Sequence, residues 1–161
     1  EKFIRGAGHE IGVKRSYSKL IPVTKSKKTY RGKIKVRDYK KEPLADGAAI
    51  KSGDLIEVRL KVDSKNDYSY LIFEDFKPAG FEPLELKSGC KFEHGAWVYR
   101  ELRDEKVVHF VNSLPQGSQV MSYRLRAEIP GTFRILPHKA QAMYAPRIRA
   151  ISDSAGIRVS D

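Results

Sequence analysis

Histidine and cysteine are the residue types that most often build metal centres and activated nucleophiles. This chain of 161 residues has one cysteine, Cys90, and four histidines, His9, His94, His109 and His138. The histidines stand far apart along the sequence, whereas the histidine ligands of structural zinc sites come in closely spaced pairs. The sequence therefore predicts no metal, no cofactor, no catalytic residue and no enzyme. His109, on a stretch of alternating residues, is expected on a polar face.

Two carboxylates held close together could act as the acid and base of a glycosidase. Acidic residues are adjacent at Glu74 and Asp75, and they alternate with arginines and a lysine in residues 100–106. Opposite charges interleaved in this way are typical of a solvated hairpin surface, which is the interpretation we favour. Residues 63–67 (DSKND) are too short and too lysine-interrupted for a calcium loop, so they are expected to form a turn.

Cys90 and Glu93 have the spacing of an internal thioester, which joins a cysteine thiol to a side-chain carbonyl. A thiol closes that ring on a glutamine, which loses ammonia, whereas Glu93 is a carboxylate and cannot react in this way. Cys90 is therefore expected to be an ordinary loop cysteine. As the single cysteine it also cannot form a disulfide within the chain.

The positive charge is concentrated near the beginning of the chain. The formal net charge is +11, and residues 1–42 hold 14 Lys or Arg but 4 Asp or Glu. Basic residues with Tyr30 and Tyr39 among them could neutralise phosphates and stack on bases. Lysines are also common on exposed sheet edges, and no nucleic-acid-binding motif is present. We expect a basic, variable hairpin at about 24–42 and no nucleic-acid partner, with an anionic polymer or nucleic acid bound by residues 14–41 as the less favoured alternative.

Alternation of apolar and polar residues predicts the strands that would position these side chains. It is clearest in residues 55–62, and residues 68–74 are expected to pair back onto them as a hairpin. Residues 97–101 and 106–111 predict a second hairpin, and 156–159 a closing strand. The side chains of 55–62 expected to face inward are Ile56, Val58, Leu60 and Val62.

The stretch 114–146 carries a second clear pattern and is expected to form a β-meander. Its strands are predicted at 120–127 and 132–136, followed by a short run at 139–144 that ends in Met143-Tyr144. Proline and glycine separate the first two strands, because proline cannot donate to a strand ladder. The side chains expected to face inward are Met121, Tyr123, Leu125, Ala127, Phe133 and Ile135.

Together these patterns predict an all-β fold, an antiparallel β-sandwich of the fibronectin-III-like type with little helix. No window has a sustained 3.6-residue apolar period, and no run approaches the about 18 apolar residues of a membrane span. The length suits one domain, predicted at 11–161 after a linker at 1–10. The chain begins with Glu1 and has no apolar leader, so we expect a domain excised from a longer protein.

Several short motifs, in this order and spacing, resemble the C-terminal macroglobulin-like domain of bacterial alpha-2-macroglobulin family proteins. The resemblance covers about residues 11–160 and is weakest over 24–50. The motifs are Lys51-Ser52-Gly53-Asp54, EDFKPAGFEP at 74–83, YRELRD at 99–104, YRLRA at 123–127, PGTF at 130–133 and AMYAP at 142–146.

The resemblance implies a non-catalytic module of a broad-spectrum protease-trapping inhibitor. In this family a protease cuts a bait segment, and a thioester in a separate helical domain then acylates the protease. The last sandwich domain docks on that helical domain, and Met143 and Tyr144 match the motif that shields the thioester from water. The implied partners are the neighbouring macroglobulin and thioester domains of the same polypeptide and, through the full-length protein, target proteases.

The resemblance also implies a location in the cell envelope, periplasmic or secreted, with membrane contact only through an anchor elsewhere in the parent protein. The alternative function is that of an adhesive or spacer β-sandwich, for which the fold alone gives no discrimination. A further alternative for Met143 and Tyr144 is that they simply alternate between core and surface at the end of a strand.

Overall fold

The computed structural model describes residues 3–30, 32–85, 89–93 and 96–161. Within these ranges the regular structure consists of β-strands, and no helix is present that could cross a membrane. The strands are β1 (Ala7–Gly8), β2 (Ile11–Thr29), β3 (Gly32–Leu44), β4 (Ala48–Lys51), β5 (Leu55–Ser64), β6 (Tyr68–Phe76), β7 (Phe81–Pro83), β8 (Gly89–Glu93), β9 (Ala96–Leu102), β10 (Lys106–Leu114), β11 (Gly117–Ala127), β12 (Gly131–Ile135), β13 (Lys139–Ala142), β14 (Ala145–Ile151) and β15 (Ala155–Ser160).

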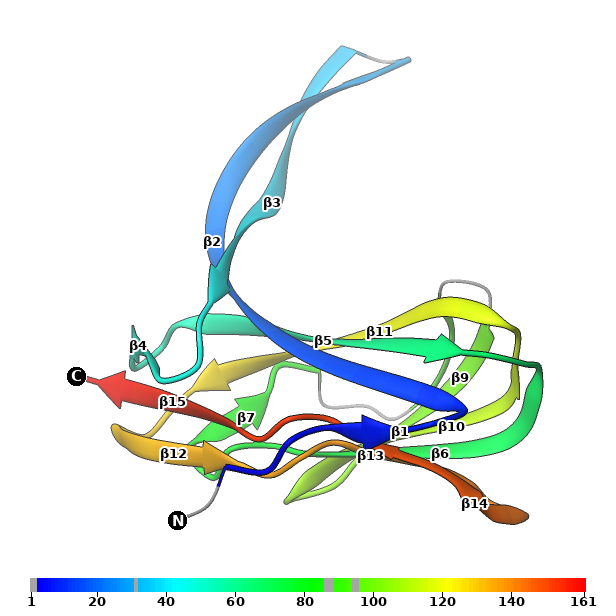
Figure 1. Cartoon of the computed structure of the whole chain (residues 1–161). Helices are drawn as coiled ribbons and strands as arrows, with labels where there is room; N and C mark the ends of the chain where they lie inside the picture. Colours follow the sequence, from blue (N-terminus) through cyan, green and yellow to red (C-terminus); the bar gives the residue numbers. More distant parts are fainter. Residues whose placement is uncertain (1–2, 31, 86–88, 94–95) are drawn as a thin grey trace.

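The strands form two large sheets that face each other and a small sheet at one end (Figure 1). The larger has the order β1-β14-β13-β6-β10-β9-β8, and the five-stranded sheet has the order β3-β2-β5-β11-β7. The small sheet is β12-β15-β4, in which β4 and β15 run parallel while the other recorded pairs are antiparallel. The predicted all-β antiparallel sandwich is confirmed.

The core lies between the inner faces of the two large sheets. The inward residues predicted for 55–62 are all fully buried, and Met121, Tyr123, Leu125 and Ala127 of β11 are buried beside them. From the seven-stranded sheet, Leu71 and Phe73 of β6 complete this core. The side-chain alternation of these strands was therefore predicted correctly.

The pairing of the strands was predicted less well. β5 and β6 are not a hairpin, because β5 lies between β2 and β11 while β6 lies between β10 and β13 in the opposite sheet. The turn at 63–67 therefore carries the chain across the sandwich, over the ~10 Å that separates packed sheets. The expected meander over 114–146 is also wrong, since β11, β12 and β13 lie in three different sheets. The hairpin of β9 and β10 and the closing strand β15 are confirmed.

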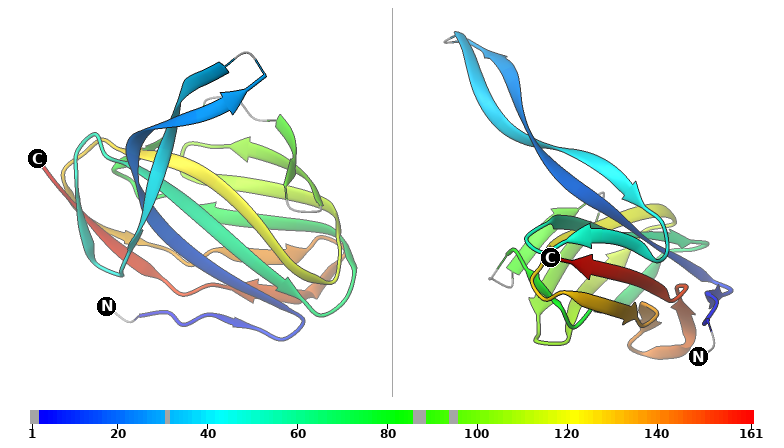
Figure 2. Two further views of the ribbon diagram at one scale, coloured as in Figure 1. Left: turned by 90° about the horizontal axis from the view of Figure 1, so that it is seen from above. Right: turned by 90° about the vertical axis from the view of Figure 1, so that its left-hand side faces the viewer.

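The longest strand, β2, belongs to the body of the domain over its first half only. Residues 11–20 pair with β5, whereas the remainder of β2 pairs with β3 alone. This second half and β3 form a hairpin that rises from the sandwich on the outer side of the five-stranded sheet (Figures 1 and 2). A basic hairpin was expected at about 24–42, but the strand that leads into it continues without interruption past residue 23.

The segment before β2, expected to be a linker, lies against the sandwich over part of its length. β1 pairs with the end of β14, and the Ile4 carbonyl accepts a hydrogen bond of 2.9 Å from the Ser154 amide. Gly8 is required where the segment turns into β2, because a Cβ there would lie 2.2 Å from the Ile11 carbonyl oxygen. The segment thus supplies β1, the short edge strand of the seven-stranded sheet.

Candidate functional site

Met143 and Tyr144 form the turn between β13 and β14, at the end of the sandwich remote from the hairpin (Figure 1). The two residues are 47% and 80% exposed. The Met143 amide donates a hydrogen bond of 2.8 Å to the Tyr70 carbonyl at the start of β6. Two large side chains thus stand out from a turn whose backbone is attached to a neighbouring strand.

Tyr70 lies beside these two residues, although no feature of the sequence marks it as a site residue. Tyr70 is 51% exposed, and its ring lies edge-on to the Tyr144 ring, with centroids 5.4 Å apart. Its φ of 56° is in the left-handed region, which costs a bulky residue energy and often marks a functional position. The sequence around it predicts only a strand, because alternation carries no information about a positive φ. We call Tyr70, Met143 and Tyr144 the turn cluster.

The strand that leads to the turn cluster is held on both sides. β13 pairs with β6 on one side and with β14 on the other, and its Ala140 and Ala142 are buried. A register shift between Gln141 and Ala142 introduces the turn. Pro146, just beyond, biases Ala145 toward an extended backbone. The turn cluster therefore stands on a rigid support.

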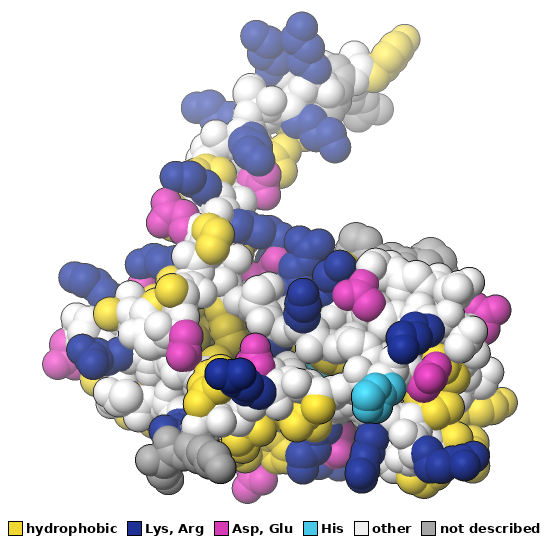
Figure 3. Space-filling view, viewed as in Figure 1, with side chains coloured by type: hydrophobic (Ala, Val, Ile, Leu, Met, Phe, Trp, Pro, Cys, Tyr) yellow, Lys and Arg dark blue, Asp and Glu magenta, His cyan; other side chains and the backbone are white. Residues whose placement is uncertain are grey.

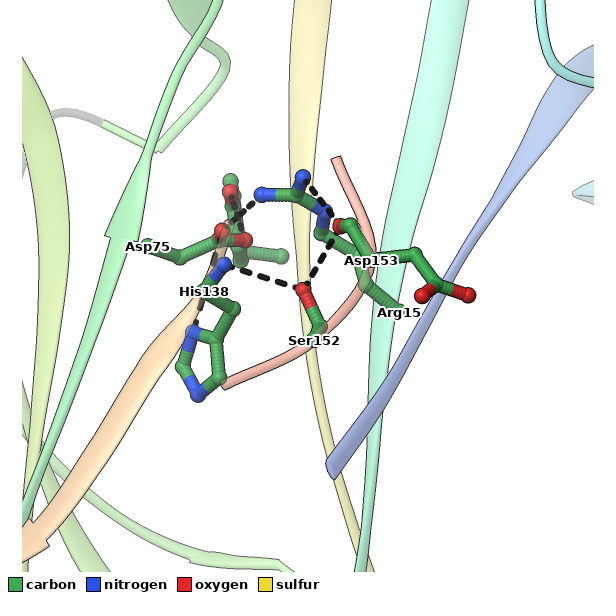
Figure 4. A network of polar contacts seen from close by, with 6 residues as sticks. Arg15, Asp75, His138, Ser152 and Asp153 are labelled. Carbon is green, nitrogen blue, oxygen red and sulfur yellow. Dashed lines mark hydrogen bonds and ion pairs between the residues drawn. The ribbon is translucent and has the colours of Figure 1, made fainter. Parts of the chain in front are cut away.

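A buried polar network fixes the other end of β13 (Figure 4). His138 and Ser152 hold each other through two hydrogen bonds of 3.0 Å, from the His138 amide to Ser152 Oγ and from the Ser152 amide to the His138 carbonyl. Asp75 lies beside them and pairs with Arg15 Nη1 at 2.5 Å. Arg15 Nη2 also donates to the Asp153 carbonyl at 3.3 Å. The network joins β2 of one sheet to β6 of the other.

Asp75 is fully buried and nevertheless ionised. Burial by itself would raise the pKa of this carboxyl, but His138, the Arg15 guanidinium and the Tyr123 hydroxyl lower the pKa to about 2. Arg15 at 2.5 Å and the Tyr123 hydroxyl at 2.7 Å donate hydrogen bonds, whereas His138 Nδ1, at 3.7 Å, is too distant to do so. We therefore assign the lowered pKa mainly to Arg15 and Tyr123. The expectation of a solvated charge is wrong for Asp75.

His109 is also buried, so its predicted place on a polar face is wrong. It is 1% exposed, and neither ring nitrogen has a hydrogen-bond partner among the described residues. Burial, together with the nearby His138 and Arg100 side chains, lowers the pKa of His109 to about 3. The alternating pattern placed it on a strand, but the facing sheet covers that side.

The other residues considered for chemistry lie apart from one another. Glu74 pairs with Lys106 and Glu101 with Arg103 on accessible surface, as the interleaved charges predicted. Cys90 is exposed but lies in β8, so the loop position expected for it is wrong. His9 is exposed, and His94 falls outside the described residues. Within the described ranges no three His, Cys, Asp or Glu side chains are placed to hold a metal ion.

The chain matches known proteins over most of its length. A model of the family described as the bacterial alpha-2-macroglobulin MG10 domain matches residues 11–147. The alpha-2-macroglobulin of Pasteurella multocida (strain Pm70) is 34% identical over 110 residues, which are 66% of this chain and 6% of that protein. This chain therefore spans only a small part of the curated relative.

Solved structures show the same fold. Salmonella alpha-2-macroglobulin reacted with methylamine has a TM-score of 0.69 and 18% identity, over 100% of this chain and 10% of that one. Native Escherichia coli alpha-2-macroglobulin, from domain MG7 to the C-terminus, has a TM-score of 0.62 and 20% identity, over 95% and 24%. The family match is decisive: the chain belongs to the MG10 domains of bacterial alpha-2-macroglobulins, as part of a larger polypeptide with neighbouring domains.

Proposed function

We propose that this domain docks on the thioester domain of its own polypeptide through the turn cluster and keeps water away from the thioester. The domain itself is non-catalytic. It serves a protein that traps proteases of broad specificity by letting the thioester acylate them after the bait segment has been cut. The parent protein acts in the cell envelope, periplasmic or secreted, and reaches a membrane only through an anchor elsewhere in the polypeptide.

The observation that carries this proposal is the exposure of Met143 and Tyr144 on a rigid turn. Large apolar side chains that pack in their own core are buried, whereas these two and Tyr70 are exposed together. Tyrosine and methionine suit a docking surface, because tyrosine is a rigid amphipathic plate and methionine fills irregular gaps. The left-handed φ of Tyr70 is the kind of strain that is retained at binding sites.

A thioester requires such a cover because water hydrolyses it. Water adds to the acyl carbon of a thioester, the carbon–sulfur bond breaks, and a carboxylic acid and a free thiol remain. A ring and a thioether packed over the bond exclude the water molecule that begins this reaction. Docking must also be reversible, because the thioester has to become accessible when a protease is trapped.

The proposal is tested with Tyr144→Ala in the full-length parent protein. A fully docked ring buries about 150–250 Å², and truncating such an anchor weakens docking by about 2 kcal/mol or more. We expect free thiol to appear at least about tenfold faster than in the wild type before any protease is added, as measured by thiol titration over time. The thermal unfolding of the domain should change little, since Tyr144 contributes little to its core.

Tyr30→Ala is the matched control, because Tyr30 is a fully exposed tyrosine at the tip of the basic hairpin. It should leave thiol release at the wild-type rate. Tyr70→Gly removes a ring of the turn cluster while permitting the positive φ, so it should accelerate release without strain in the backbone. Thiol release at the wild-type rate in Tyr144→Ala would refute the shielding role.

A further inference from the structure

Residues 21–42 of β2 and β3 form a hairpin whose two faces differ in chemistry. Residues directly opposite in an antiparallel pair share a face, and successive residues alternate between faces. One face carries the aliphatic residues among lysines: Val23, Lys25, Lys27, Ile34 and Val36. The other carries hydroxyl and cationic side chains: Thr24, Ser26, Lys28, Lys33, Lys35 and Arg37. We call the second the cationic face.

The cationic face has no carboxylate of its own over this span. The hairpin's two carboxylates, Asp38 and Glu42, lie on the aliphatic face and pair with lysines there. Lys28 lies directly opposite Lys33, and both side chains are exposed. Like charges in direct opposition destabilise a strand pair, so an anionic partner would relieve a repulsion that the hairpin now contains.

The cationic face continues through β2 onto the outer surface of the five-stranded sheet. Arg59 and Arg124 lie on that surface, and the Arg124 guanidinium is 5.2 Å from the ring centre of Tyr39 at the foot of the hairpin. Glu57, on the same surface, is already paired with Lys41 at 2.7 Å. Lys and Arg side chains accordingly gather along the hairpin and at its foot (Figure 3).

We propose that the cationic face binds an acidic surface of a second neighbouring domain of the same polypeptide. Opposite charge is the first argument, because exposed cations without counterions favour an acidic partner and orient it. The second is that the rest of the polypeptide is tethered to this domain, which raises the effective concentration of its other domains. The turn cluster lies at the far end of the sandwich, so one docked domain leaves the hairpin free for another (Figure 1).

Other anionic partners fit the surface less well. The hairpin stands up from the sheet, so a flat bilayer could touch the hairpin or the sheet but not both (Figure 2). Single-stranded nucleic acid needs a series of free rings on which successive bases stack. Of the hairpin's two tyrosines, Tyr30 is exposed at the tip, whereas Tyr39 is half-buried beneath Arg124.

Carbodiimide crosslinking of the full-length parent tests the proposal, because it joins a lysine amine to a carboxylate only where the two are in contact. We expect Lys28, Lys33 or Lys35 to be linked to Asp or Glu of another domain, and the links to be lost in about 1 M salt, where the screening length falls to about 3 Å. An equal mixture of isotopically labelled and unlabelled protein should yield links within one polypeptide.

A charge-reversal variant supplies a second readout. Lys28→Glu with Lys33→Glu and Lys35→Glu should accelerate hydrogen exchange of the amides in residues 24–37 by about tenfold, because an undocked hairpin opens more often. Lys65→Glu, at an exposed lysine between β5 and β6, should leave that exchange unchanged. Unchanged exchange in the triple variant, links between two polypeptides, or salt-resistant binding of the parent to DNA or to anionic vesicles would each overturn the proposal.

Discussion

Arg15 and Lys28 lie in the same strand, β2, but their surroundings differ completely. Arg15 is in the half that pairs with β5, and its side chain is almost fully buried against Asp75. Lys28 is in the half that pairs with β3 alone, where it faces solvent and another lysine. Arg15 therefore joins the two sheets through defined partners, whereas the charge of Lys28 is exposed and has a like charge directly opposite it.

The two halves show that burial, rather than residue type, decides how much a charged side chain contributes to the stability of the fold. A buried ion pair is costly to break, because removing one partner leaves the other charge without solvent. An exposed charge is screened by water and salt and contributes little to its own fold. Substitutions in the buried half of β2 should therefore change the free energy of unfolding strongly, whereas substitutions of exposed charges in the other half should change it little.

Asp75→Ala should have the largest effect. It leaves Arg15 buried without its carboxylate, and we expect the free energy of unfolding to fall by about 3–5 kcal/mol. Urea denaturation of the domain measures this loss. Asp38→Ala breaks the exposed pair with Lys25 and is the matched control, for which we expect no measurable shift of the midpoint. Equal losses in the two variants would contradict the contrast between the halves.

The pH dependence of stability should distinguish the contributions of two buried groups, His109 and Asp75. The pKa of His109 is about 3 in the folded protein, below its unfolded value of about 6.5, so the unfolded state binds the extra proton as pH falls. Stability should then decrease from about pH 6.5 downward by up to about 1.4 kcal/mol per pH unit. The pKa of Asp75 is about 2, so its contribution is lost only below about pH 4.

His109→Leu should remove the loss that begins near pH 6.5 and retain the loss below about pH 4. Urea midpoints measured at intervals between these values provide the comparison. Because the His109 ring nitrogens have no hydrogen-bond partner among the described residues, stability at neutral pH should not suffer from the loss of its polar atoms. A variant with the wild-type slope between pH 6 and pH 4 would show that another group titrates there.

The smallest effect is expected in the hairpin. Lys33→Gln and Lys35→Gln remove exposed charges, and the first also removes the repulsion with Lys28. The thermal midpoint of the domain should therefore stay unchanged or rise slightly. A large loss of stability would mean that these lysines have partners within the domain, and that the cationic face is not available for binding.

Alternation within single strands was sufficient to determine much of this fold. The inward residues of β5, β11 and β12 follow from a period of two, because neighbouring side chains of a strand point to opposite faces whatever it pairs with. The scarcity of helix follows from the absence of a 3.6-residue period. The positive charge of the hairpin likewise follows from its amino-acid composition. The family motifs are short continuous stretches, so they can be recognised from the sequence without a structure.

Tertiary structure alone decided what lies opposite each strand. The same alternation fits a hairpin of β5 and β6 or two strands in facing sheets, because side-chain period carries no information about partners distant in sequence. For that reason Asp75 and His109 were expected at the surface, while the facing sheet buries both. Tyr70 joins Tyr144 only because β13 returns beside β6, which places residues far apart in the chain in contact.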